Sequence, residues 1–182
     1  MKAPKFMAAL AALLLVETTL HAQTAPVLQP IKPWVVHYDD AECYAERTYG
    51  NDVILGIRPS PNGETYELLV AHKRTGPQEA QQLQGSVDFG QEPIKASLLR
   101  HGIKDHPYVV DKYRVSASEM AVAHNAETVT FHVVGNAEER FALASMPGVM
   151  ATLDKCNEDL RRYWNMGEAE QAHIRHGAVG DV

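Results

Sequence analysis

The residues of this sequence come nearest to supporting the chemistry of a serine hydrolase. Ser86 follows Gly85 in a stretch that reads as a strand, and His124, His132 and several aspartates lie elsewhere in the chain. In such enzymes an imidazole takes the serine proton while a carboxylate orients the imidazole. No G-x-S-x-G motif surrounds Ser86, and its neighbours do not provide the sharp turn that this nucleophile needs. We therefore expect no enzymatic activity, with a hydrolase as the alternative.

Histidines at two places invite a metal interpretation. His101 and His106 flank a short loop that also holds Asp105, and a second pair, His173 and His176, lies near the C-terminus. Neither pair brings the three or four ligands that a zinc or copper site requires. We predict no metal site and no cofactor.

The first 22 residues have the layout of a bacterial signal peptide. Lys2 and Lys5 precede an apolar run over 6–16, and Ala22 supplies a small residue at the expected cleavage point. The alternative is a membrane anchor, but the run is short for a bilayer span. We expect a mature chain from Gln23, in the periplasm or secreted, with no membrane span.

Charge limits the partners of the mature chain. The full sequence carries a formal net charge of −6, and loss of Lys2, Lys5 and Glu17 makes the remainder one unit more negative. A protein that neutralises phosphates needs clustered basic residues, so we expect no nucleic-acid partner. The remaining length suits one domain with its own core.

The chain holds two cysteines, Cys43 and Cys156, which in an exported protein most simply form one disulfide. The rival interpretation is a pair of free or metal-binding thiols. No second Cys or His stands at ligand spacing from either one, and no C-x-x-C motif is present. We predict a buried, structural disulfide.

One long amphipathic helix is expected over Ser145–Trp164. Ser145 would cap its first turn, Pro147 is tolerated there, and Gly167 suits the far end. The apolar side chains recur at helical spacing: Val149, Leu153, Cys156, Leu160, Tyr163 and Trp164. Thr152, Asp154, Lys155, Asn157, Glu158, Arg161 and Arg162 are expected on the opposite, solvent face.

Most of the chain before this helix reads as short strands. Asn62-Gly63 is a strong hairpin signal, and Ser116 with Glu119 forms a capping box that opens a short helix. About eight strands at short spacing indicate a mainly β fold, an antiparallel β-sandwich or partly open barrel with the C-terminal helix across it. The expected organisation is a Pro-containing leader at 23–33, one domain at 34–166 and a loose tail at 167–182.

Several of these features together resemble a known group of exported domains. They are the Trp34 strand soon after the signal peptide, Cys43, the Phe141 strand that leads into Met146-Pro147-Gly148, and a helix that carries Cys156 and ends at Trp164. The arrangement is similar to the invasion-associated locus B group and to extracytoplasmic domains that precede TonB-type C-termini. The resemblance implies a β-sandwich-like fold and no enzymatic activity.

Three functions follow as hypotheses. The first is an exported, non-enzymatic binding module whose partner is an envelope protein or a glycan. The second is a purely structural envelope protein, and the third is a hydrolase. An exposed apolar or aromatic patch would favour the first, a surface without a cleft the second, and a pocket where Ser86 meets a histidine and an aspartate the third.

Overall fold

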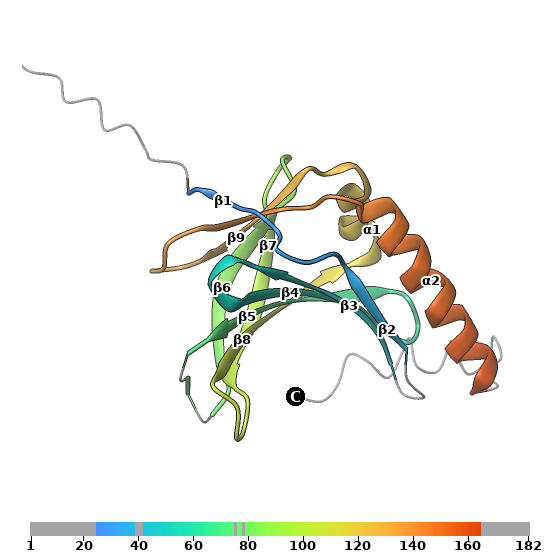
Figure 1. The fold of residues 1–182 in the computed structure, drawn as a ribbon, viewed down its shortest axis with the longest axis horizontal. Helices are drawn as coiled ribbons and strands as arrows, with labels where there is room; N and C mark the ends of the chain where they lie inside the picture. The colour runs from blue at the N-terminus through green and yellow to red at the C-terminus, as the bar shows by residue number, and fades with distance from the viewer. Residues whose placement is uncertain (1–24, 39–41, 75, 78, 165–182) are drawn as a thin grey trace, which may run out of the picture.

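The computed structural model of the chain describes residues 25–38, 42–74, 76–77 and 79–164. Within them the chain is mainly β, and its strands form one sheet that curls into a half-barrel with helix α2 packed against it (Figure 1). This confirms the expected fold class. The proposed signal peptide and the proposed tail at 167–182, including Gly167, lie outside the described residues.

Ten strands form the sheet: β1 (Val27–Leu28), β2 (Val35–Tyr38), β3 (Cys43–Tyr49), β4 (Val53–Pro59), β5 (Thr65–Lys73), β6 (Gln81–Asp88), β7 (Ile94–Gly102), β8 (Tyr108–Ser116), β9 (Thr128–Val133) and β10 (Glu139–Ala142). The helical elements are the 3₁₀ turn η1 (Gly50–Asp52), α1 (Ala117–Met120), the 3₁₀ turn η2 (Ala121–Asn125) and α2 (Met146–Tyr163). The capping box is present, since the Ser116 hydroxyl accepts from the Glu119 amide while the Glu119 carboxylate accepts from the Ser116 amide.

The strand order is β1-β10-β9-β6-β7-β8-β5-β4-β3-β2. Every neighbouring pair is antiparallel except β1 with β10, which is parallel. The β4–β5 hairpin turns at Asn62 and Gly63, as the sequence predicts, and Gly63 takes a φ of +73° that a side chain would strain.

The segment expected to be a leader at 23–33 contributes to the sheet instead. Val27 and Leu28 pair with β10, and Pro30 then forms a bridge with Tyr49 of β3. The Ile31 amide donates to the Thr48 carbonyl at 3.0 Å. Prolines suggested a linker because they cannot donate to a strand ladder, yet the edge of a sheet tolerates them. The described domain therefore begins before Trp34.

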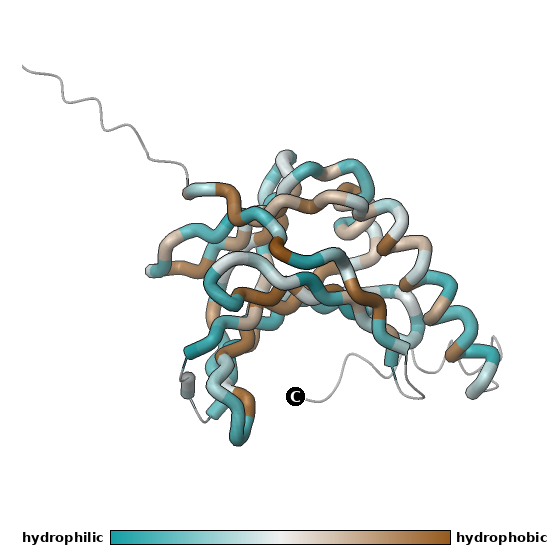
Figure 2. Tube along the Cα trace, in the orientation of Figure 1, coloured by the Kyte–Doolittle hydropathy of each residue, from teal (hydrophilic) through white to brown (hydrophobic). Residues whose placement is uncertain are grey.

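The core fills the inner side of the curl. Along each strand, buried apolar residues alternate with more exposed ones, a pattern that Figure 2 shows as alternating brown and teal along the tube. Aromatic rings occupy its centre: the Phe131 ring lies 4.9 Å from Tyr113 and 5.7 Å from Phe141, centroid to centroid. Phe141 in turn meets Tyr49 edge-on at 5.0 Å.

Helix α2 covers this core with a stripe at the expected spacing, although its limits differ from the prediction. Its buried residues are Met146, Val149, Met150, Leu153, Cys156 and Asn157. Asn157, expected on the solvent face, is buried because its amide donates to the Ser60 carbonyl at 2.8 Å. Tyr163, expected on the apolar stripe, is 70% exposed because the stripe ends before the last turn.

The start of α2 also differs from the prediction. Ser145 has a left-handed backbone, with φ of 71°, and its side chain makes no capping bond. The reason lies in the turn before the helix, where the Ala144 carbonyl accepts from Trp34 Nε1 at 3.1 Å and from Arg47 Nη1 at 2.9 Å. These two donors fix the chain between β10 and α2, and the sharp turn falls on Ser145.

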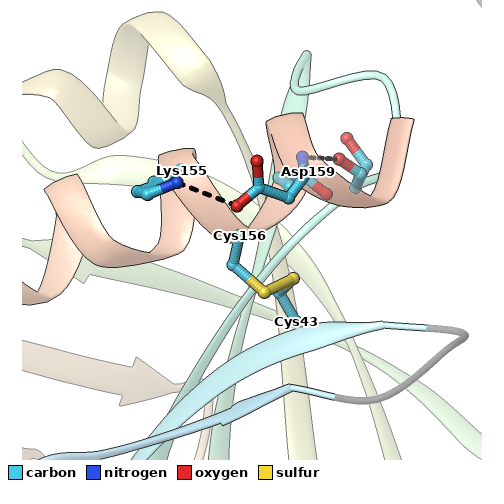
Figure 3. The surroundings of a disulfide bond; sticks show 6 residues. Cys43, Lys155, Cys156 and Asp159 are labelled. Carbon is cyan, nitrogen blue, oxygen red and sulfur yellow. Dashed lines mark hydrogen bonds and ion pairs between the residues drawn. A yellow bond between two sulfur atoms is a disulfide. The ribbon is translucent and has the colours of Figure 1, made fainter. Parts of the chain in front are cut away.

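The predicted disulfide is present and joins the helix to the sheet. Cys43 at the start of β3 and Cys156 in α2 are each 1% exposed, with Cα atoms 6.1 Å apart. Figure 3 shows Cys156 pointing from the helix toward the strand. Lys155 and Asp159 pair with each other on the exposed side of the helix, Nζ to Oδ2 at 2.9 Å. The disulfide is thus enclosed between the two layers.

We expect Cys43→Ala, Cys156→Ala and the double variant each to lower the free energy of unfolding by about 2–5 kcal/mol. The three losses should be similar because any one change removes the same cross-link. Urea unfolding of the three variants and the wild type measures this. A double variant that loses the sum of the two single losses would show that the cysteines contribute separately.

Candidate functional site

A cleft of about 380 Å³ lies on the outer face of the sheet, over β6, β9 and β10. The strand residues that line it are all polar: Ser86, Asp88, Thr128, Thr130, His132 and Arg140; Glu138, in the turn before β10, also lines it. Alternation explains this, since their neighbours Val87, Val129, Phe131 and Phe141 point into the core. The inner face makes the core, and the outer face carries the cleft.

Strand register places the cleft residues in two rows. Ser86 is the partner of His132, and Lys95 of β7 extends that row beyond Ser86. The second row joins Asp88 to Thr130 and Thr130 to Arg140. Small hydroxyl side chains therefore form the middle of the cleft, and longer charged side chains stand around them.

Gly85 allows β6 and β9 to approach this closely. A Cβ atom at Gly85 would lie 2.3 Å from the His132 carbonyl oxygen and 3.0 Å from a methyl of Leu98. Backbone cannot yield as a flexible side chain can, so a larger residue would push the strands apart. Gly85 is thus what holds Ser86 beside His132.

His132 is the central imidazole of the cleft. Its Nδ1 is buried and makes no hydrogen bond, and the nearest carboxylate oxygen, Glu138 Oε1, is 3.9 Å away. The structure therefore places Ser86, His132 and Asp88 around one hollow. This is the arrangement that the hydrolase hypothesis requires. His124, the other histidine considered, lies in η2 away from the cleft.

Asp88 is occupied by its own turn. Its Oδ1 accepts from the Gly90 amide at 2.6 Å and from the Gln91 amide at 3.1 Å, which fixes the β6–β7 turn at one wall of the cleft. The carboxylate thereby stabilises the wall, and Glu138 is the carboxylate nearer to His132.

Arg140 supplies a permanent positive charge to the cleft. Its Nη2 donates to Thr128 Oγ1 at 3.3 Å, while its Nε is buried without a hydrogen-bond partner. Among the described residues no carboxylate lies within ion-pair distance of it. A buried donor without an acceptor costs about 1–3 kcal/mol, so an acceptor placed here would be bound favourably. Sequence reasoning missed Arg140 because only the pairing of β10 with β9 brings it to Ser86.

The histidines considered for metal binding do not gather. His101 lies on β7 opposite Val110, whereas His106 lines a separate loop pocket of about 220 Å³ with Gly76 and Lys104. Over the described residues, no group of three or more His, Cys, Asp or Glu side chains is placed to hold a metal ion. His173 and His176 lie outside those residues.

A second polar cluster lies at the end of the half-barrel away from α2. Arg100 and Asp111 face each other in two hydrogen bonds of 2.6 Å, with side chains 17% and 5% exposed. His72 of β5 meets Glu139 of β10 at 3.1 Å, although these strands are not neighbours in the sheet. A pocket of about 190 Å³ lies between them, lined by both ion pairs. Burial raises the pKa of the Tyr113 phenol beside it.

A charged network crosses the outer face at the other end of the sheet. Arg58 pairs with Glu67 and with Glu42, and Lys112 and Arg114 approach the same Glu67 carboxylate at 3.6 and 3.4 Å. Burial alone would raise the pKa of Glu67, but its hydrogen bonds to Arg58 and the surrounding positive charges hold it below the ordinary value of 4.5. This network of three cations and two carboxylates joins β4, β5 and β8 across the sheet.

Exposed large apolar side chains are spread over separate parts of the surface. They are Ile31, Val35 and Tyr38 near β2, Ile103 in the β7–β8 loop, Val134 after β9, and Tyr163 at the end of α2. Tyr49, Tyr66 and Tyr113 belong to the core instead. The outer cleft is thus the feature of the described surface best suited to binding.

Comparison of the chain with protein-family models, with curated proteins and with solved structures finds no match in any of the three.

Asp111→Ala should lower the free energy of unfolding by about 3–5 kcal/mol, because it leaves the Arg100 guanidinium buried without its partner. The double change Arg100→Met with Asp111→Leu should recover most of that loss, since it removes both charges. Asp159→Ala on the exposed face of α2 is the matched control, with an expected loss under about 1 kcal/mol. Urea unfolding of these variants measures the losses. Equal losses of unfolding free energy for Asp111→Ala and Asp159→Ala would contradict a stabilising buried pair of Arg100 and Asp111.

The stabilisation that ionised Glu67 provides should be lost in acid. Because its pKa is lower folded than unfolded, the stabilisation is present above 4.5 and is lost as pH falls through the folded value. Glu67→Gln should be less stable than the wild type at pH 7 and should lose less stability between pH 5 and 3. Unfolding midpoints across that range test this, with Glu158→Gln on α2 as control. Parallel curves for Glu67→Gln and the wild type would disprove the linkage.

Proposed function

We propose that this protein is an exported, non-enzymatic binding domain of the bacterial envelope, and that the outer cleft is its binding site. The observation that carries the proposal is that Arg140 and His132 line one hollow and each has a buried nitrogen, Nε and Nδ1, without a hydrogen-bond partner. A purely structural protein has no need of such a hollow, since unsatisfied buried donors reduce stability. A ligand that offers an acceptor to the Arg140 Nε–H and a hydrogen-bonding group to His132 Nδ1 would satisfy both.

Export is supported by the pattern of the first 22 residues together with the disulfide. Disulfides persist in oxidising compartments and are rare in the bacterial cytosol. Within the described residues no helix is long and apolar enough to cross a membrane. Both findings are compatible with a location outside the cytoplasm, and the likeness to the invasion-associated locus B group stays a prediction.

The geometry around Ser86 favours binding over catalysis. Ser86 lies inside the sheet between Lys95 of β7 and His132 of β9, so the peptide groups beside it take part in the strand ladders. Hydrolysis of an acyl group requires free backbone or side-chain donors that stabilise an oxyanion next to the nucleophile. A strand in mid-sheet does not supply them, in contrast to the sharp turn of known serine nucleophiles.

A hydrolase is the second candidate, and one observation favours it. Ser86 and His132 are cross-strand partners, and Glu138 stands beside His132 Nδ1, so the three residue types of a catalytic triad share the cleft. A fluorophosphonate probe separates the two candidates because it reacts only with an activated serine. Labelling of the wild type that Ser86→Ala abolishes would establish the hydrolase in place of the binding domain.

The binding function predicts that blocking the cleft abolishes capture of an envelope component. Thr130→Tyr places a bulky ring on the outward side of β9, at the middle of the cleft, where strands accept tyrosine well. The immobilised mature chain, from Gln23, is exposed to solubilised envelope, and retained material is quantified by mass spectrometry. We expect Thr130→Tyr to retain at least about tenfold less of a component that the wild type retains.

Ser97→Tyr is the matched control, because Ser97 also points outward from the sheet, on β7, but does not line the cleft. It should behave as the wild type. Equal retention by all three proteins would reject the outer cleft as the site. Intact mass of the protein in periplasmic and membrane fractions tests export separately, and an uncleaved chain in the membrane fraction would count against it.

A further inference from the structure

The cleft has the form and chemistry of a site for a small hydroxylated acid. Its volume, about 380 Å³, lies within the range of small-molecule sites. The hydroxyls of Ser86, Thr128 and Thr130 lie between the longer side chains that surround the hollow. Each hydroxyl both donates and accepts, so together they match the alternating donors and acceptors of a sugar ring.

Arg140 selects a carboxylate. A guanidinium presents its N–H donors in a fixed planar fork that fits two carboxylate oxygens. The contact to Thr128 holds one end of that fork, and the buried Nε has no acceptor among the described residues. An arginine that already had a carboxylate partner, as Arg100 has in Asp111, would not be available in this way.

The remaining charges favour a single negative charge on the ligand. Asp88 and Glu138 also line the cleft and would repel a dianion such as a phosphate monoester. Arg140 is the permanent cation among the lining residues. Because these two carboxylates already outnumber the Arg140 guanidinium, they oppose a dianion more strongly than a ligand with one negative charge.

We propose, as a refinement that rests on the proposed binding function, that the outer cleft binds a uronic acid residue of an acidic glycan. The carboxylate pairs with Arg140, His132 donates or accepts at a neighbouring ring oxygen, and the ring hydroxyls contact Ser86 and Thr130. The peptide alternative, a C-terminal carboxylate, would leave the central hydroxyls of the cleft without partners.

Calorimetric titration of the mature chain with four probes tests the assignment. The probes are methyl β-D-glucuronide, its neutral counterpart methyl β-D-glucoside, the dianion glucose 6-phosphate, and N-acetyl-L-alanine as a peptide carboxylate. We expect the glucuronide to bind at least about tenfold more tightly than each of the others. Equal affinity for glucuronide and glucoside, tighter binding of the phosphate or the peptide acid, or no binding of the glucuronide would each overturn it.

Three variants locate the carboxylate. Arg140→Met should weaken glucuronide binding at least about tenfold, and Arg140→Lys should recover only part of it because lysine keeps the charge and loses the fork. Arg114→Met, on the outer face of β8 beyond the cleft, should bind as the wild type. Equal losses at Arg140 and Arg114 would indicate attraction by charge alone and would overturn the site.

Two measurements distinguish a failure of the uronate assignment from a failure of the proposed binding function. Amide chemical shifts of the wild type should move at Ser86, Thr130 and Arg140 on addition of glucuronide, a test that needs no variant to fold. If Thr130→Tyr abolishes envelope capture while glucuronide does not bind, the uronate assignment fails and the binding function stands. If capture does not depend on the cleft either, both fail.

Discussion

The contact between β3 and β10 decides the form of this protein. These strands lie far apart in the strand order, yet Tyr49 and Phe141, both 0% exposed, meet edge-on, and the Tyr49 hydroxyl donates to the Ala142 carbonyl at 2.7 Å. Burial raises the pKa of Tyr49 to about 12, so the hydroxyl stays a donor across the physiological range. Because the contact brings the two sides of the curl together, the chain that leaves β10 enters α2 directly over β3, where Cys156 finds Cys43.

Curling also separates two kinds of polar group. On the inner side a charge can persist only if it is paired, and Arg100 with Asp111 satisfies that condition at the mouth of the half-barrel. On the outer side Arg140 has no carboxylate partner within the described residues and its Nε is buried without an acceptor, a cost that the rest of the fold must offset. The disulfide lies at the other end of the sheet from the outer cleft, between β3 and α2.

The sequence was sufficient for features that depend on local pattern. Helical spacing located α2, Asn62-Gly63 located a hairpin, and an even number of cysteines in a chain expected to be exported predicted their pairing. It was insufficient where distant strands meet. The pairing of β6 with β9 is not between consecutive strands, so nothing near Ser86 indicated that His132 would be its neighbour. The predictions for Asn157 and Ser145 were wrong for the same reason. Asn157 bonds to Ser60, and the turn at Ser145 is fixed by Trp34 and Arg47, all far away in sequence.

The N-terminal segment shows how a sheet edge and a site can share one constraint. Pro26 and Pro30 bracket β1 and limit its ladder to Val27 and Leu28, which suits an edge strand because proline offers no amide for further pairing. Val27 is the partner of Arg140, so this short strand holds the backbone of the residue that charges the cleft, and Ala25 forms part of its wall. A longer edge strand would continue along β10 beside the cleft. The prolines that made this stretch read as a linker therefore keep β1 short beside the cleft, while the pairing of Val27 holds Arg140 in register.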